Sequence, residues 1–261
     1  MSKKPNAVFA EVRRRELVDF INRAKKVTVS ELCSHFDVSA ATIRVDLTEL
    51  EKANLLKRVH GGALSISDVA EPELTSKEKS GLHSAQKRAI AQLARGLIVP
   101  GSTIALDTGT TTLELAKQLA DLPELTILTN DIKIALYLEE YSSHTVIFLG
   151  GTIRKHFHCT VGQMVTDSLE AIHIDTFFVA TNAINLEWGL STPSIDIANV
   201  KSKLIRNARR TVLLADSSKI GKDSLARFAT IREIDTFITD SNADPSFLES
   251  IRQTGVDVIC T

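Results

Sequence analysis

In Val27-Thr-Val-Ser-Glu-Leu-Cys-Ser-His-Phe-Asp-Val-Ser-Ala-Ala-Thr-Ile-Arg-Val-Asp46, the residue types and their spacing predict two short helices joined by a tight turn. Thr28 precedes Glu31 by three residues, which is the spacing of a capping box at the start of a helix. The turn is expected at Asp37, and Ser39 is an N-cap residue for the second helix. One face of that helix is apolar and carries Ile43, Leu47 and Leu50.

The opposite face of the second helix carries small, polar and basic side chains, which suit a DNA major groove. A helical hairpin with a solvated charged face fits the same spacing, because helix-turn-helix patterns are degenerate. Residues 55–64 follow as a short strand pattern with a Gly-Gly turn, which predicts a β-wing whose basic residues reach the DNA backbone. The residues expected at the DNA are Thr28, Ser39, Ala40, Ala41, Thr42, Arg44, Val45, Thr48, Lys52, Lys57, Arg58 and His60.

A further helix is predicted ahead of this stretch, over residues 8–24. Its expected buried stripe is Leu17, Phe20, Ile21 and Ala24. Its other side holds a basic cluster, Arg13 to Arg15, which either contacts DNA phosphates or forms a solvated face. Together these elements predict a winged helix-turn-helix domain over residues 1–64.

Charge is distributed unevenly along the 261 residues, although the formal net charge is only −1. Residues 1–65 hold twelve Lys and Arg against eight Asp and Glu, whereas the remainder holds nineteen against twenty-four. A basic module joined to an acidic body fits a nucleic-acid reader that carries a second function.

Membrane and secreted classes do not fit the composition. No apolar run approaches the ~20 residues of a membrane span, and the N-terminal stretch lacks the hydrophobic core of a signal peptide. The three cysteines, Cys33, Cys159 and Cys260, are far apart and fit reduced thiols. We therefore expect a cytoplasmic protein.

Residues 65–82 are rich in Ser, Asp, Glu and Lys and contain Pro72, which predicts a linker. Beyond it lies a second domain, residues 83–261, which opens with a helix over 84–97. Seven short apolar runs then predict buried strands, near 103–106, 125–128, 145–149, 176–180, 211–215, 236–239 and 256–259. Helices are expected near 111–120, 131–140, 161–172, 196–208 and 245–253. This alternation predicts an α/β domain with a largely parallel sheet.

Polar or Gly-rich residues follow several of these strands, at the edge where parallel sheets bind ligands. In Asp107-Thr-Gly-Thr-Thr-Thr112 a glycine allows a sharp turn, and threonine hydroxyls and amides then form an anion nest suited to phosphate. A simple capping loop fits this turn equally well. The same theme recurs at Thr129-Asn130, at Gly150-Gly151 with Arg154, and at Asp216-Ser-Ser-Lys219. No G-x-G-x-x-G or Walker lysine occurs, so no nucleotide cofactor is expected.

Both parts of the chain resemble the DeoR family of bacterial transcription regulators. Ser39 to Leu47 and Leu50 to Ala63 resemble its DNA-binding signature, with one departure: Val45 stands where the family usually has a basic residue. The motifs at residues 107–111, 128–130, 150–151, 189 and 215–219 look like its sugar-phosphate sensor domain. The resemblance implies a ribose-5-phosphate-isomerase-like fold. The effector contacts it implies are Asp107, Gly109, Thr110, Thr111, Thr112, Thr129, Asn130, Gly150, Gly151, Arg154, Lys201 and Lys219.

The same likeness raises the question of catalysis. Aligned on residues 215–219, the catalytic Glu and Asp positions of the isomerase fall on Lys201 and Asn182, and neither side chain serves as a general base. We therefore expect binding without turnover. Lys201 is then either a phosphate contact or a helix-surface lysine. His156-Phe-His-Cys159 holds metal-ligand residue types but lacks a second ligand pair, so no metal is expected. Trp188 is either core or pocket wall.

The function expected from the sequence is a transcriptional repressor of a carbohydrate-utilisation operon. Its partners would be double-stranded operator DNA, a phosphorylated sugar or sugar alcohol as effector, and further copies of itself. Two other functions stay open: a sugar-phosphate isomerase with an appended DNA-binding domain, and an architectural DNA-binding protein with no effector.

Overall fold

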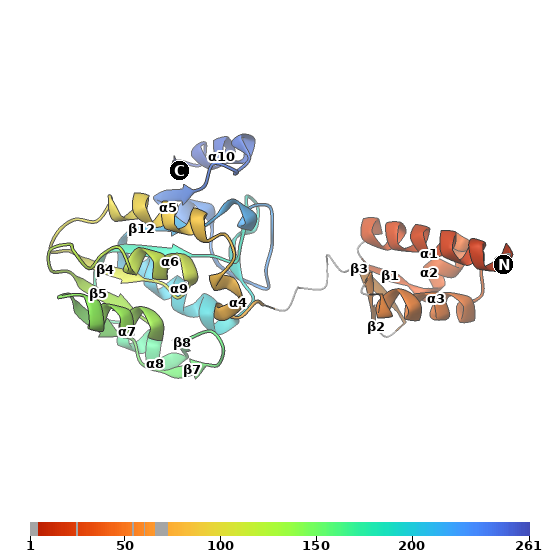
Figure 1. Cartoon of the computed structure of the whole chain (residues 1–261), viewed down its shortest axis with the longest axis horizontal. Coiled ribbons are helices and arrows are strands. Elements are labelled where there is room, and N and C mark those ends of the chain that lie inside the picture. The colour runs from red at the N-terminus through yellow and green to blue at the C-terminus, as the bar shows by residue number, and fades with distance from the viewer. Residues whose placement is uncertain (1–4, 25, 54, 60, 66–72) are drawn as a thin grey trace. The chain divides into compact units, whose positions relative to one another are not determined.

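The computed structural model describes residues 5–24, 26–53, 55–59, 61–65 and 73–261 (Figure 1). The chain divides into two compact units, Met1–Glu73 and Leu74–Thr261, called here the first and second units. None of the helices in the described ranges is long and apolar enough to cross a membrane.

The first unit is a winged helix. Its elements are α1 (Pro5–Ala24), β1 (Lys26–Thr28), α2 (Val29–Phe36), α3 (Ala40–Lys52), β2 (Leu56–Val59) and β3 (Gly62–Ser65). The three strands form an antiparallel sheet in the order β1-β3-β2, and the β2–β3 hairpin is the expected wing. Gly62 is required there, because a Cβ atom at this position would lie 2.1 Å from the carbonyl oxygen of Val27.

Local chemistry fixes the two helices as the sequence predicted. Thr28 Oγ1 accepts the Glu31 amide at 3.2 Å, and Glu31 Oε2 accepts the Thr28 amide at 2.7 Å, which completes the capping box. Asp37 ends α2 with a φ of 50°, a left-handed conformation that Asp tolerates well. Ser39 Oγ then accepts the amide of Thr42 and starts α3.

A small core holds the three helices against the sheet. Leu17 and Ile21 of α1 are fully buried, as predicted, and Phe20 is partly buried, whereas Ala24 is exposed where α1 ends. The other buried apolar residues are Val27, Leu32, Ile43, Leu47, Leu50, Leu56 and Ala63. Each large side chain contributes roughly 1.5–3 kcal/mol by leaving water. This core fixes which face of α3 points outward.

The second unit is built on one parallel sheet of seven strands, in the order β15-β14-β12-β9-β4-β5-β6. Every neighbouring pair in it is parallel. The strands are β4 (Thr103–Leu106), β5 (Thr126–Thr129), β6 (Thr145–Phe148), β9 (Ile174–Ala180), β12 (Ala208–Leu214), β14 (Thr236–Thr239) and β15 (Asp257–Cys260). The predicted α/β architecture is confirmed.

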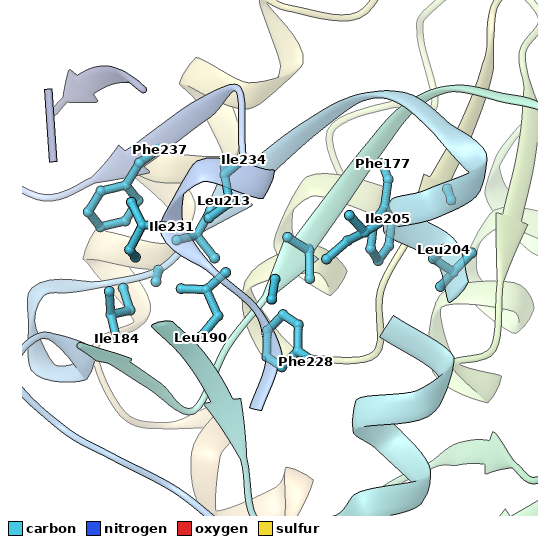
Figure 2. Packing of buried hydrophobic residues seen from close by; sticks show 14 of the residues in the cluster. Phe177, Ile184, Leu190, Leu204, Ile205, Leu213, Phe228, Ile231, Ile234 and Phe237 are labelled. Atoms are coloured by element: carbon cyan, nitrogen blue, oxygen red, sulfur yellow. The ribbon is translucent and has the colours of Figure 1, made fainter. Parts of the chain in front are cut away.

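Helices cover both faces of this sheet. They are α5 (Ser84–Arg95), α6 (Thr110–Ala116), α7 (Ile132–Tyr141), α8 (Gln163–Ser168), α9 (Ile195–Asn207) and α10 (Pro245–Arg252). Phe177 and Phe178 are adjacent on β9 and point into different core clusters, because successive strand side chains face opposite sides. Phe178 packs with residues of α5, α6 and α7. Phe177 packs with residues of α8, α9 and α10, in the cluster that Figure 2 shows.

The pattern of apolar runs missed two small antiparallel elements. One is a hairpin of β7 (Thr152–Arg154) and β8 (Cys159–Val161). The other is a sheet of β10 (Ala183–Asn185), β11 (Gly189–Thr192) and β13 (Ala226–Ala229). Two short 3₁₀ turns, η1 (Ser217–Lys219) and η2 (Ile231–Glu233), complete the unit.

The expected linker, residues 65–82, contains an ordered helix, α4 (Ser76–Ser80). Thr75 and Glu78 cap it with a full capping box. The amide of Ser76 donates to the carbonyl of His156 at 3.1 Å, and Ser76 Oγ donates to the carbonyl of Phe157 at 2.9 Å. The prediction of a linker up to residue 82 is therefore wrong for α4, which is part of the second unit.

Candidate functional site

The outward face of α3 carries the residues expected to read DNA. Val45 at its centre is 59% exposed, and Ala41, Arg44 and Lys52 are also exposed. Ala40, Thr42 and Thr48 are partly exposed, and Ser39 and Thr28 are exposed at the helix starts. A convex helix that exposes small, apolar, polar and basic side chains matches the shape of a major groove.

The inner side of α3 is fixed to α1 by an ion-pair cluster. Asp46 is buried and accepts from Arg13 Nε at 2.7 Å and from Arg14 Nε at 2.8 Å. Arg13 and Arg14 of α1 therefore form ion pairs within the first unit and are not simply solvated side chains. The two guanidiniums each donate to the buried Asp46 carboxylate, which compensates its charge and fixes the orientation of α3 relative to α1.

Several residues predicted to bind DNA form hydrogen bonds or ion pairs within α3 or between α3 and the wing. Arg58 Nη1 donates to Thr48 Oγ1 at 2.6 Å, and the Arg58 amide donates to Glu51. Lys52 pairs with Glu49 at 2.9 Å. Lys57 lies on β2, and His60 falls outside the described residues. The two Arg58 bonds therefore fix the wing against α3, and Arg44, Lys52 and Arg58 are exposed on these two elements.

In the second unit, a buried ion pair stands where β4 ends. Asp107 is 1% exposed and Lys201, from α9, is 3% exposed, and Lys201 Nζ donates to Asp107 Oδ2. The ammonium also donates to the carbonyl of Ala180 at 2.8 Å, and the Ala180 amide donates to Asp107 at 2.9 Å. Lys201 is thus not a helix-surface lysine. Burial raises the pKa of Asp107, and the charge of Lys201 opposes that shift.

Two polar oxygens at neighbouring strand ends are buried and have no hydrogen-bond partner in the described part of the chain. They are Asp107 Oδ1 after β4 and Asn130 Oδ1 after β5. The Asn130 amide group is fixed by a 2.9 Å bond to the carbonyl of Thr160 on β8, so its oxygen keeps one orientation. Buried acceptors normally find donors, and two together suit the hydroxyl groups of a sugar.

The expected anion nest is already partly occupied by protein groups. Asp131 caps α7 and accepts from Thr108 Oγ1 at 2.8 Å. Burial raises the pKa of Asp131, and hydrogen bonds from the Thr108 hydroxyl and from amides that include Gly109 oppose that rise. Thr111 is buried, and Thr112 Oγ1 turns back to the carbonyl of Gly109. Thr129 Oγ1 accepts the amide of Asp131. This turn therefore presents acceptors for hydroxyls more than donors for a phosphate.

The β7–β8 hairpin forms the rim beside these strand ends. The Arg154 guanidinium stacks on the Phe157 ring at 3.7 Å. Gly151 approaches β8 closely, since a Cβ there would lie 2.8 Å from the carbonyl of Val161, whereas Gly150 has open space around it. Cys159 is buried, and burial raises its pKa to about 11, so this thiol is unreactive. The described residues contain no cluster able to hold a metal ion.

A group of lysines gathers near the end of β12. Lys219 is partly exposed on η1, next to the buried Asp216. Lys87 of α5 is only 5% exposed, and burial lowers its pKa, opposed most strongly by Asp216, while the charge of Lys219 lowers it further. Its ammonium donates to the carbonyls of Lys79 and Leu82.

Lys87 is not among the site residues predicted from the sequence, although its position in the predicted helix indicates that it is buried. A lysine stands three residues before Ile90 and seven before Ala94, on the apolar stripe of the predicted helix. A charged residue on a buried stripe indicates a partner or a function. Two other residues have structural roles: Asn182 Oδ1 accepts from Thr192, and Trp188 is 42% exposed beside Arg227 rather than core.

Comparison with protein families now identifies the chain. Residues 13–69 match the DeoR-like helix-turn-helix domain, and residues 82–241 match the DeoR C terminal sensor domain. The chain belongs to the DeoR family. It is a helix-turn-helix transcriptional regulator with a DeoR sensor domain.

Relatives match nearly end to end, three of them as follows. The HTH-type transcriptional regulator GlpR of Haloferax volcanii is 36% identical over 95% of this chain and 96% of its own. A putative aga operon transcriptional repressor of Escherichia coli is 34% identical over 95% and 92%. The HTH-type transcriptional repressor GlcR of Bacillus subtilis is 30% identical over 97% of each chain.

Among solved structures, the DeoR-family chain is similar to a ribose 5-phosphate isomerase from Methanocaldococcus jannaschii. The TM-score is 0.39 at 17% identity, over 52% of this chain and 54% of that one. A probable sor operon regulator from Shigella flexneri gives 0.41 at 11% identity, over 65% and 88%. At these scores the likeness says nothing of function, which rests on the family matches.

Proposed function

We propose that this DeoR-family regulator represses a carbohydrate-utilisation operon and leaves its operator when a phosphorylated sugar or sugar alcohol binds the second unit. The observation that carries the proposal is the pair of unpartnered acceptors, Asp107 Oδ1 and Asn130 Oδ1, at the same sheet edge as a group of cations. Acceptors bind hydroxyls, and ammonium and guanidinium groups bind phosphate.

In this proposal the effector lies across the carboxyl ends of the strands. Its hydroxyls meet Asp107 and Asn130, and its phosphate meets Lys219, Lys87 and Arg154. Two of the relatives, the putative aga operon repressor and GlcR, are named as repressors, which supports repression as the direction of control. Loss of DNA binding on sugar phosphate is the expected behaviour.

The operator-binding form is a homo-oligomer. One winged helix reads few base pairs, so useful affinity requires at least two copies on repeated half-sites. The second unit is the larger of the two and is the part that we propose assembles the copies.

Catalysis is not part of the proposed function. The isomerase reaction requires a carboxylate base. Here Lys201 is held as an ion pair with Asp107, and Asn182, which has no titratable group, accepts from Thr192. Binding without turnover follows from these two positions.

A thermal-shift screen tests the effector, with operator binding measured by fluorescence anisotropy on the same samples. Glucose 6-phosphate, ribose 5-phosphate, glycerol 3-phosphate and related compounds serve as probes, with their unphosphorylated forms and inorganic phosphate as controls. We expect one phosphorylated compound to raise the melting temperature and lower operator affinity. Turnover of a probe would instead support the isomerase. Failure of every probe to shift the melting temperature would favour an architectural DNA-binding protein.

A further inference from the structure

Helix α4 is short, yet it is firmly defined by its own cap. Thr75 Oγ1 accepts the Glu78 amide at 3.3 Å, and Glu78 Oε2 accepts the Thr75 amide at 2.7 Å. The first unit ends at Glu73, so α4 is the first element of the second unit. Within the second unit, α4 is therefore the element nearest in sequence to the DNA-binding unit.

The first attachment of α4 is to the rim of the effector site. Ser76 donates through its amide to His156 and through its hydroxyl to Phe157. The Phe157 ring lies 5.7 Å from the Lys79 ammonium and also carries the Arg154 guanidinium. This hairpin turn is itself fixed, because the Ile132 amide donates to the carbonyl of His158 at 2.8 Å.

The second attachment is to the lysine group near β12. The Lys87 ammonium donates hydrogen bonds to the carbonyls of Lys79 and Leu82, at 2.7 Å and 2.5 Å. These bonds fix the C-terminal end of α4 and the turn after it. Lys87 is desolvated and lies within the electrostatic reach of Asp216 and Lys219. Both attachments of α4 therefore involve residues of the proposed effector site.

We propose that α4 is a latch that docks when the effector's phosphate is bound and undocks when the site is empty on operator DNA. This inference rests on the proposed function and concerns how the same site acts. The charged form of Lys87 is the stronger donor to both carbonyls. Burial and the charges of Lys219 and Lys79 disfavour that form, whereas the charge of Asp216 favours it. A phosphate beside Lys87 and Lys219 removes that penalty and strengthens docking.

Docking changes how far the DNA-binding unit can reach. With α4 undocked, residues 74–82 join the chain between the two units. About nine residues span up to ~30 Å when extended. That length is close to the ~34 Å between half-sites one helical turn apart. When α4 is docked, residues 74–82 no longer add to the chain between the two units, and that chain is shorter. Two DNA-binding units held by one oligomer then lose their simultaneous contact with the operator.

Hydrogen exchange of the full chain tests the latch, with and without glucose 6-phosphate, ribose 5-phosphate, glycerol 3-phosphate and inorganic phosphate. Any probe that raises the melting temperature and releases operator should slow exchange of the 74–83 segment about tenfold or more. Unchanged exchange with such a probe would overturn the latch and leave the proposed function intact. If no probe binds or releases operator, the proposed function fails, and the latch, which depends on it, fails with it.

The sharpest variant is Ser76→Pro. Ser76 is the first residue of α4, where proline is favoured, and Thr75 already has the extended conformation that precedes proline. The change removes both bonds to the hairpin without breaking α4. We expect probe binding to persist and operator release to need at least tenfold more probe. Ser80→Ala is the matched control, since Ser80 Oγ donates within α4 to Lys77. Release by Ser76→Pro at the wild-type midpoint would refute the latch.

Discussion

Lys201 on α9 and Asp107 at the end of β4 form an ion pair that is almost wholly buried, although they are separated by 94 positions in sequence. The pair joins a helix on one face of the sheet to the edge where the effector is proposed to bind. It leaves one Asp107 oxygen without a protein partner in the described residues. One oxygen of this carboxylate is therefore used in the ion pair, and the other is the acceptor that we propose for an effector hydroxyl.

Removing one member of this pair should destabilise the protein. Lys201→Met leaves Asp107 buried without its cation, at an expected cost of about 3–5 kcal/mol. Replacing both, as Lys201→Met with Asp107→Asn, should cost less than the sum of the single changes. Urea denaturation of the four proteins of this cycle measures the coupling. Lys203→Met on the same helix is the control, and additive single effects would contradict the buried-pair interpretation.

Cys159 should make stability fall at alkaline pH. Its folded pKa of about 11 is above the ordinary value of 9.0, because burial disfavours the thiolate. The stabilisation is fully present below pH 9 and is lost as pH rises toward 11, by up to about 3 kcal/mol. The difference in unfolding free energy between wild type and Cys159→Ala isolates this effect from other titrating groups. A difference that stays constant from pH 8 to 11 would show that the thiol is not desolvated.

Much of the first unit could be predicted from sequence because its signals are local. The capping box at Thr28, the N-cap at Ser39 and the spacing of Ile43, Leu47 and Leu50 each act within one helix. The pairing of Asp46 with Arg13 and Arg14 could not be predicted, because it joins residues more than thirty positions apart.

In the second unit, continuous apolar strands revealed the parallel sheet. The strands of the β7–β8 hairpin and of the sheet around β11 have three or four residues each, too few to show a period. Polar composition concealed α4, although Thr75 and Glu78 have capping-box spacing. The resemblance placed Lys201 in the site, and only the fold showed that Asp107 holds it.

Arg44 should read a base. It is exposed on the outward side of α3, so Arg44→Ala should cost about 1–3 kcal/mol in operator affinity and relax specificity at one base pair. Lys57→Ala, on the wing, should weaken all sequences alike and lower the salt slope by about one. Anisotropy titrations at several salt concentrations separate the two. Unchanged operator affinity in Arg44→Ala would mean that α3 lies differently in the groove.

Val45 should favour an A·T pair. It is the exposed large apolar residue of α3, and a branched apolar side chain suits a thymine methyl group but cannot form a hydrogen bond with guanine. Val45→Arg should shift the preferred base pair at that position toward G·C. Selection from a randomised operator library measures the preference, and identical selected sites for both proteins would contradict it.

Lys219 should be needed for release but not for DNA binding. It is partly exposed on η1 and lies near Lys87 and Asp216, so Lys219→Met removes a proposed phosphate contact at little cost to folding. We expect operator affinity to remain within about twofold of wild type and the effective sugar-phosphate concentration to rise at least tenfold. Lys222→Met, three positions away and exposed, is the matched control.

Thermodynamic linkage allows the same prediction to be tested by measuring effector affinity instead of operator affinity. An effector that lowers operator affinity by a given factor must itself bind more weakly to the operator complex by the same factor. Effector titrations of wild type with and without operator should therefore differ by the factor seen in release, whereas in Lys219→Met both titrations should be weak. Equal effector affinity for free and operator-bound wild type would rule out this coupling. Wild-type release by Lys219→Met would place the phosphate away from η1.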